Sequence, residues 1–120
     1  MTLLYTIAPY SAPTTIQVQN NIHEASIMAQ YYWLKGFAVI CPQLNSGNFD
    51  GLVSDETFLN GTMEMLKQCS HVVVHPEWKK STGSINEHIW AKDNYLTMYF
   101  PESIELLKYK IDVMLEKDRT

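Results

Sequence analysis

One stretch of the chain combines residue types that could carry chemistry, residues 78–87 with the sequence WKKSTGSINE. An apolar run, Val72 to Val74, precedes it, and an amphipathic segment, residues 85–92, follows it. This order predicts a buried strand, a polar turn and a helix, so that free backbone N–H groups and the carboxylate of Glu87 meet at one edge of a sheet. Small anionic or polar ligands bind at such turns in open α/β folds. Glu87 is therefore a candidate functional carboxylate.

A second interpretation of the same residues is purely structural. Ser84 and Glu87 stand at the spacing of a capping box, in which both side chains satisfy backbone groups at a helix start. A glutamate in a first helical turn is also favoured by the helix dipole. The spacing alone leaves the cap and the ligand site open.

Aromatic residues lie near this stretch in the expected fold. Tyr5, Tyr10 and Trp78 could pack against a sugar or a base. The alternative for both tyrosines is packing at the end of a strand, and for Trp78 it is packing in the core.

Other classes of site find little support. The chain has no Walker A sequence, no Gly-x-Gly-x-x-Gly and no nucleophile elbow. His71 and His75 are four residues, or two strand periods, apart and could share a face of one strand, but no cysteine or carboxylate spacing completes a metal site. We expect no metal and no cofactor.

The elements that must position these residues alternate regularly along the chain. Apolar runs and helical periodicities follow one another in the order β-α-β-α-β-α-β-α, which predicts a parallel sheet with right-handed crossovers. Strands are expected at residues 3–8, 37–41, 71–75 and 95–100, and helices at residues 15–35, 54–68, 85–92 and 101–117. The expected fold is one domain over residues 1–120, a three-layer α/β/α arrangement with a Rossmann-like or flavodoxin-like parallel sheet of four to five strands.

The carboxyl ends of these strands converge on one edge, where ligands bind in such folds. Ala8, Pro9 and Tyr10 follow the first strand, and a loop at residues 43–51, which includes Asn45, follows the second. Ala8, Pro9, Tyr10 and Asn45 are thus candidate substrate-binding residues.

Composition narrows the class of protein. The chain is 46% hydrophobic and 18% charged, with a net charge of −4 that argues against a nucleic-acid polymer as partner. No apolar run approaches the length of a membrane span and no leader opens the chain, so we expect no membrane association and a cytoplasmic location. Cys41 and Cys69 are expected to be free buried thiols, and the charged end, residues 116–120, is expected to fray.

The sequence resembles the nucleoside 2-deoxyribosyltransferase-like superfamily over about residues 3–100. The likeness begins with residues 5–11 (YTIAPYS), continues through residues 66–74 (LKQCSHVVV), and is most specific from Trp78 to Ala91. It is closest to small phage and bacterial members of unassigned function, which are related to 2′-deoxynucleoside 5′-phosphate N-hydrolases.

The resemblance implies cleavage or transfer at the N-glycosidic bond of a nucleoside or nucleoside 5′-monophosphate, with Glu87 as the nucleophile. It implies that Tyr5 steadies that nucleophile and that Ser81 and Gly83, with Trp78, contribute to substrate binding. It also implies a homo-oligomer, a dimer or larger. A protein that only binds a nucleotide or a nucleotide-derived signal on the same fold is the alternative.

Departures from the family pattern favour that alternative. Ala8 replaces a usual glycine, Glu77 another glycine, and Ser70 and Thr62 replace aspartates. The leaving base then has no evident acid, unless Asp50, Asp55, Glu64 or a group of a neighbouring chain supplies it.

Overall fold

The sheet consists of four parallel strands in the order β2-β1-β3-β4. The computed structural model describes residues 1–118 and gives β1 as Leu3–Ile7, β2 as Ala38–Ile40, β3 as His71–Val74 and β4 as Thr97–Tyr99. β1 pairs with both β2 and β3, and β3 pairs with β4. The expected parallel sheet of an α/β fold is confirmed.

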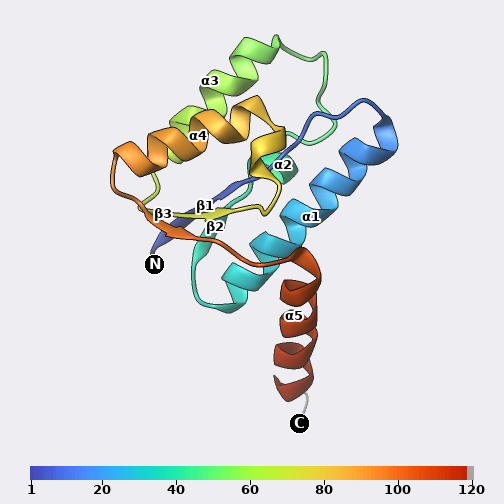
Figure 1. Ribbon diagram of the computed structural model, residues 1–120, viewed down its shortest axis with the longest axis vertical. Helices are drawn as coiled ribbons and strands as arrows, with labels where there is room; N and C mark the ends of the chain where they lie inside the picture. Colours follow the sequence, from blue (N-terminus) through green and yellow to red (C-terminus); the bar gives the residue numbers. More distant parts are fainter. Residues whose placement is uncertain (119–120) are drawn as a thin grey trace.

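Helices cover both faces of this sheet and complete the three layers (Figure 1). α1 (Thr15–Leu34) and α5 (Ile104–Asp118) pack against each other on one face, and α3 (Asp55–Leu66) and α4 (Thr82–Asp93) lie on the other. A single helical turn, α2 (Pro42–Asn45), follows β2, and a 3₁₀ turn, η1 (Trp78–Lys80), precedes α4. Within residues 1–118, none of the helices combines the length and apolar character needed to cross a membrane.

Two apolar clusters fill the space between these layers. Side chains of β1 alternate between them: Leu4 joins α1 and α5 in one cluster, and Tyr5 and Ile7 join α3 and α4 in the other. Because both faces of β1 and β3 are covered, these strands are apolar along nearly their whole length, as parallel strands usually are. Cys41 and Cys69 are free, and Cys69 is buried in the second cluster.

Several expected boundaries are wrong, and among them the last helix begins at Ile104 rather than at residue 101, because Ser103 accepts the Leu106 N–H at its start. The loop at 43–51 begins as α2, because Pro42 occupies the first turn and its fixed φ suits a helix start. α4 begins at Thr82 rather than Ile85, because Ser81 caps it. β4 begins at Thr97 rather than Tyr95, because Tyr95 has φ of 59° in the turn that ends α4. The last helix reaches Asp118, so part of the expected frayed end, residues 119–120, lies outside the described residues.

Gln43 of α2 ties the second connection to the end of the first strand. Its side chain is 5% exposed, accepts a hydrogen bond from the Thr6 hydroxyl at 2.8 Å, and donates one to the Ala8 carbonyl oxygen at 2.9 Å. The buried polar groups at the end of β1 are thereby satisfied. The backbone after β1 is held in one position at the sheet edge.

Candidate functional site

The sheet changes direction between β1 and β3. The chain leaves β1 through α1 towards β2 on one side, and returns through α3 to β3 on the other side. In open α/β sheets, ligands bind in the crevice beyond the carboxyl ends of the strands at such a point. Tyr5 lies within β1, and the other predicted site residues except Asn45 follow β1 or β3, so they belong to this region.

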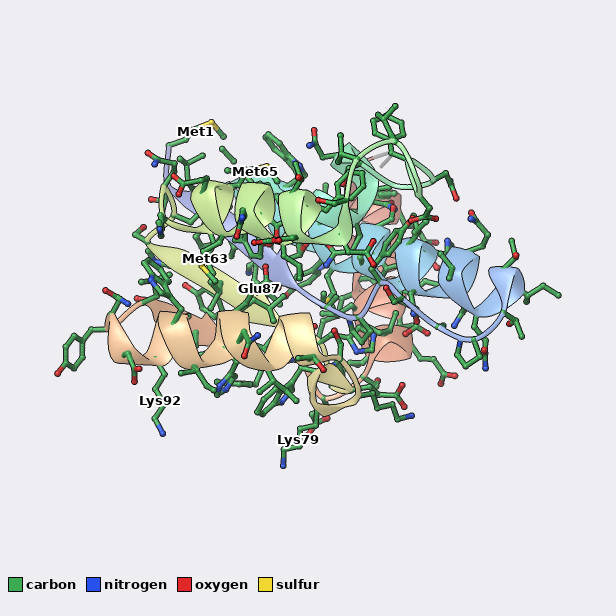
Figure 2. The ribbon with its side chains drawn as sticks, turned by 90° about the horizontal axis from the view of Figure 1, so that it is seen from above. Met1, Met63, Met65, Lys79, Glu87 and Lys92 are labelled. Carbon is green, nitrogen blue, oxygen red and sulfur yellow. The ribbon has the colours of Figure 1, made fainter. Side chains whose placement is uncertain are left out.

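Tyr5 and Glu87 form the central contact of the region. The Tyr5 hydroxyl of β1 donates a hydrogen bond to Glu87 Oε2 of α4, across most of the sequence. Tyr5 is fully buried and Glu87 is 9% exposed. Figure 2 shows Glu87 in the strip between α3 and α4. The two residues predicted to act together are brought together.

Burial alters the acid–base behaviour of this pair. It raises the pKa of Glu87 to about 7, since the charged carboxylate loses solvation, and the Tyr5 hydrogen bond acts in the opposite direction. The pKa of Tyr5 is raised by its own burial and by the charge of Glu87, and the nearby Thr62 hydroxyl of α3 acts against this rise. Glu87 thus changes charge close to neutral pH, a property typical of functional carboxylates.

The capping interpretation of Glu87 is wrong. The N-cap of α4 is Ser81, whose hydroxyl accepts a hydrogen bond from the Ser84 backbone N–H at 3.2 Å. The first turn of α4 contains no acidic residue, and Glu87 lies in the second turn. Since no backbone N–H of the helix start needs Glu87, its buried position has no capping explanation.

Trp78 lies against the outer part of α4. Its ring stacks on the His88 imidazole with centroids 4.0 Å apart and planes 2° apart, and Lys79 Nζ lies 5.6 Å from the Trp78 ring centroid. The pKa of His88 is lowered, first by burial and then by Lys92 and Lys79. The structure therefore places the Trp78 ring on His88, and Trp78 also packs partly against the cluster of Tyr5 and Ile7.

The other predicted binding residues are divided between separate surroundings. The Tyr10 hydroxyl accepts a hydrogen bond from the Asn48 N–H at 2.9 Å and donates one to Asp50 Oδ2 at 3.2 Å, which ties the segment after β1 to the segment after α2. Ala8 and Pro9 are buried, and Gln43 holds the Ala8 carbonyl. Gly83 faces α3, as its Cβ position lies 3.6 Å from Leu59 Cδ2.

Asn45 is not near Glu87. It lines a hollow of about 530 Å³ along the free edge of β2, with Trp33, Leu44 and Met65 among the other lining residues. Glu87 does not line this hollow.

Several residues with clear structural roles were not foreseen as parts of the site. His75, at the end of β3, is 4% exposed; its Nε2 lies 2.7 Å from Glu24 Oε1, and its Nδ1 accepts the Glu77 N–H at 2.9 Å. Since Nδ1 accepts, Nε2 carries the proton and donates it to Glu24. Histidine followed by proline at a strand end was the available signal, but the partner on α1 lies 51 residues away.

Among residues 1–118, no group of three or more His, Cys, Asp or Glu side chains could hold a metal ion.

Ser84 presents an uncommon feature beside Glu87. It occupies the same buried stripe of α4 as Glu87 and Ala91, it is 1% exposed, and its hydroxyl oxygen has no hydrogen-bond partner. A buried hydroxyl without a partner is destabilising, because it loses water and gains nothing in return.

Two serine substitutions should separate the cap from this unpaired hydroxyl. Ser81→Ala removes the N-cap and should lower the free energy of unfolding by about 1 kcal/mol. Ser84→Ala, its matched control, removes a hydroxyl that makes no hydrogen bond and should leave stability unchanged or raise it. Urea unfolding followed by circular dichroism measures both; equal losses would contradict the assignment of Ser81 as the cap.

The pKa of Glu87 predicts a specific dependence of stability on pH. Because the pKa rises from its ordinary 4.5 to about 7, the folded protein binds this proton more tightly than the unfolded chain does. The resulting stabilisation is complete below pH 4.5 and is lost as the pH rises to about 7. Over that range, we expect the free energy of unfolding of the wild type to fall by on the order of 3 kcal/mol relative to that of Glu87→Gln, which cannot titrate at this position.

Urea unfolding across the same range measures this difference. Glu105→Gln, at an exposed position of α5, is the matched control and should follow the wild-type curve. A constant difference between wild type and Glu87→Gln would mean that Glu87 titrates as an exposed carboxyl.

Comparison with known proteins places the chain in a family. Residues 11–100 match the family model described as a domain of unknown function, DUF4406. The matched segment includes Glu87, Ser81 and Gly83, and Tyr5 precedes it. No curated protein matches the chain significantly. Because the family model covers well over half of its residues, the protein belongs to the DUF4406 family.

Proposed function

We propose that the protein cleaves, or transfers at, the N-glycosidic bond of a nucleoside or nucleoside 5′-monophosphate, with Glu87 as the nucleophile. The observation that carries this proposal is the buried hydrogen bond between Tyr5 and Glu87 at the point where the sheet changes direction. DUF4406 is related to the nucleoside 2-deoxyribosyltransferase-like fold, which the stretch from Trp78 to Ala91 resembles. Both lines of support meet at the same carboxylate.

The chemistry follows from the state of that carboxylate. Ionised Glu87 attacks the anomeric carbon of the sugar, a C–O bond forms, and the C–N bond breaks with its electron pair leaving on the base. Water then attacks the glycosyl ester in a hydrolase, or a second base does so in a transferase, and Glu87 is released. Tyr5 donates its hydroxyl hydrogen to Glu87 and so orients the carboxylate and favours its ionised form.

The start of α4 supplies groups suited to the rest of the substrate. Backbone N–H groups of a helix N-terminus attract anionic or polar oxygens, and Ser81 and Gly83 lie there. In this proposal they bind the sugar or a 5′-phosphate. A glycine at position 83 keeps the backbone accessible, since no Cβ covers it.

A specific observation favours the second candidate, a nucleotide-binding protein without catalysis. The pKa of Glu87 responds to its burial and to Tyr5, and no other carboxyl contributes to its shift. Thr62 stands where the resemblance implies an aspartate, so the departing base has no evident proton donor within this chain. A homo-oligomer is part of the proposal, since a neighbouring chain could supply that acid. A cytoplasmic location is proposed as well.

Base release tests the proposed reaction directly. Purified protein is incubated with deoxy- and ribonucleosides and their 5′-monophosphates, with and without an acceptor base, and free base is measured by chromatography. The rate of base release by Glu87→Gln should be at least about a thousandfold lower than that of the wild type, because the nucleophile is absent. Glu105→Gln should release base at the wild-type rate. Equal turnover by Glu87→Gln and wild type would exclude the mechanism. No release, together with a rise in melting temperature caused by a nucleotide, would establish the binding protein instead.

The pH profile of base release tests the role of Tyr5. Since Glu87 must be ionised to attack, the rate should fall as the pH drops below about 7. Tyr5→Phe removes the hydrogen bond that lowers the pKa of Glu87, so this fall should begin at higher pH than in wild type. Tyr109→Phe, on the exposed face of α5, should leave the profile in place. An unmoved profile in Tyr5→Phe would show that Tyr5 does not act on the charge of Glu87.

A further inference from the structure

Glu87 is enclosed in the structure described above. It is 9% exposed, Tyr5 is fully buried, and the hollow of about 530 Å³ lies along the edge of β2 instead. An attack on a sugar requires the anomeric carbon to reach the Glu87 carboxylate. A neighbouring element must therefore move before a nucleoside can enter.

α3 is the least firmly held of the elements around Glu87. It is a helix of 12 residues in which Leu66, at its C-terminal end, is the one buried residue. By contrast, α4 buries Ser84, Glu87 and Ala91 along one stripe. The N-terminal part of α3 therefore has little packing to hold it, and its opening should cost little compared with unfolding of the protein.

Two backbone features add to this looseness. Gly61 lies inside α3 with nothing within 4 Å of its Cβ position, and a glycine inside a helix weakens it. The segment that leads into α3 contains Asn48 with φ of 69° and Gly51 with φ of 83°, and the side chains of Leu52 and Val53 are exposed. Tyr10 holds Asn48 and Asp50, but the stretch from Gly51 to Val53, immediately before α3, is exposed.

The contact that closes α3 over α4 is small. Leu59, which is 57% exposed, lies over Gly83, with Leu59 Cδ2 3.6 Å from the Gly83 Cβ position. Figure 2 shows α3 and α4 side by side, with Met63 and Glu87 in the strip between them. Thr62, on the same helix, donates its hydroxyl hydrogen to the Leu59 carbonyl oxygen at 3.0 Å, and it lies close enough to Tyr5 to act on the pKa of that hydroxyl. Leu59 therefore covers the start of α4, and Thr62 and Met63 lie beside the pair of Tyr5 and Glu87.

The buried stripe of α4 that includes Glu87 contains groups that gain from contact with water. The Ser84 hydroxyl has no partner while it is buried, and the Glu87 carboxylate is poorly solvated. Opening hydrates both, which offsets part of the lost apolar contact. The closed arrangement is thus only modestly favoured over an open one.

We propose that residues 55–63 of α3 form a lid that swings away from α4, with the helix anchored at Leu66, and so admits substrate to Glu87. This inference rests on the proposed function for its purpose, as the route of the nucleoside to the nucleophile. The movement itself belongs to the free protein and is measurable without substrate.

A thiol on the buried stripe of α4 that includes Glu87 should report opening of the lid. In Ser84→Cys, the thiol replaces a hydroxyl that is 1% exposed, and labelling by N-ethylmaleimide is followed for each cysteine by peptide mass spectrometry. Cys69, which is 6% exposed beside the anchor at Leu66, is the internal reference. The cysteine at 84 should react at least about tenfold faster than Cys69 and faster than global unfolding.

A second substitution identifies α3 as the moving element. Leu59→Ala weakens the closing contact and should accelerate labelling of the cysteine at 84 by about three- to tenfold. Leu44→Ala, at a position 51% exposed on α2, is the matched control and should leave the rate unchanged. If Ser84→Cys does not fold, Glu87→Cys provides a reporter one turn further along the same buried stripe.

Labelling at the rate of global unfolding, or a rate that Leu59→Ala does not change, would overturn the lid. This outcome is independent of activity. If the cysteine at 84 is labelled as expected but the protein releases no base, the lid is supported and the proposed reaction is excluded.

Discussion

The hydrogen bond between Tyr5 and Glu87 is the interaction on which the rest of the site depends. A carboxyl group buried in an apolar cluster is costly unless it is protonated or hydrogen-bonded, and Glu87 meets this constraint with a raised pKa and a single donor. The donor is on the central strand and the acceptor on α4, so the bond fixes the helix against the sheet. Burial removes Glu87 from solvent and thereby raises its pKa, so that the carboxyl group ionises near neutral pH.

Other buried polar contacts hold the surrounding backbone. Gln43 binds the end of β1, and His75 connects the end of β3 to α1 through Glu24 and to the next turn through the Glu77 N–H. Both contacts lie at the carboxyl edge of the sheet, where the connections leave the regular hydrogen bonding of the strands and need other partners. The frame around Glu87 is thereby rigid on the side of β1, β3 and α4.

The side of the site formed by α3 is less tightly packed. α3 is anchored at Leu66, and it meets the start of α4 through Leu59, so the site is closed by its least packed wall. Elements that move to admit ligands are usually drawn from the less stable parts of a fold. In the proposed reaction, an enclosed carboxylate behind a weakly held helix would be shielded from water until a substrate enters.

Much of this arrangement was predictable from local patterns. Alternating apolar runs and helical periodicities predict the parallel sheet and its order of elements, because a strand buried on both faces and a helix with one apolar stripe have distinct spacings. The resemblance likewise singled out Glu87, in the stretch from Trp78 to Ala91, and Tyr5, in the stretch of residues 5–11. Helix starts were less predictable: a serine three residues ahead of an acid looks like a cap wherever it occurs, and Ser81 and Ser84 both stand near the start of α4.

The sequence by itself determined the fold class and the carboxylate to examine, because both depend on residue spacing along one segment. The resemblance implied that Tyr5 acts on Glu87, but only the tertiary structure decided how deeply that pair is buried, that Trp78 lies on His88, and that Asn45 faces the edge of β2. It also decided that Gln43 and His75 have partners far away in the chain. These contacts join segments whose relative positions follow from packing of the whole core, and the pKa of a buried group depends on that packing rather than on its neighbours in sequence.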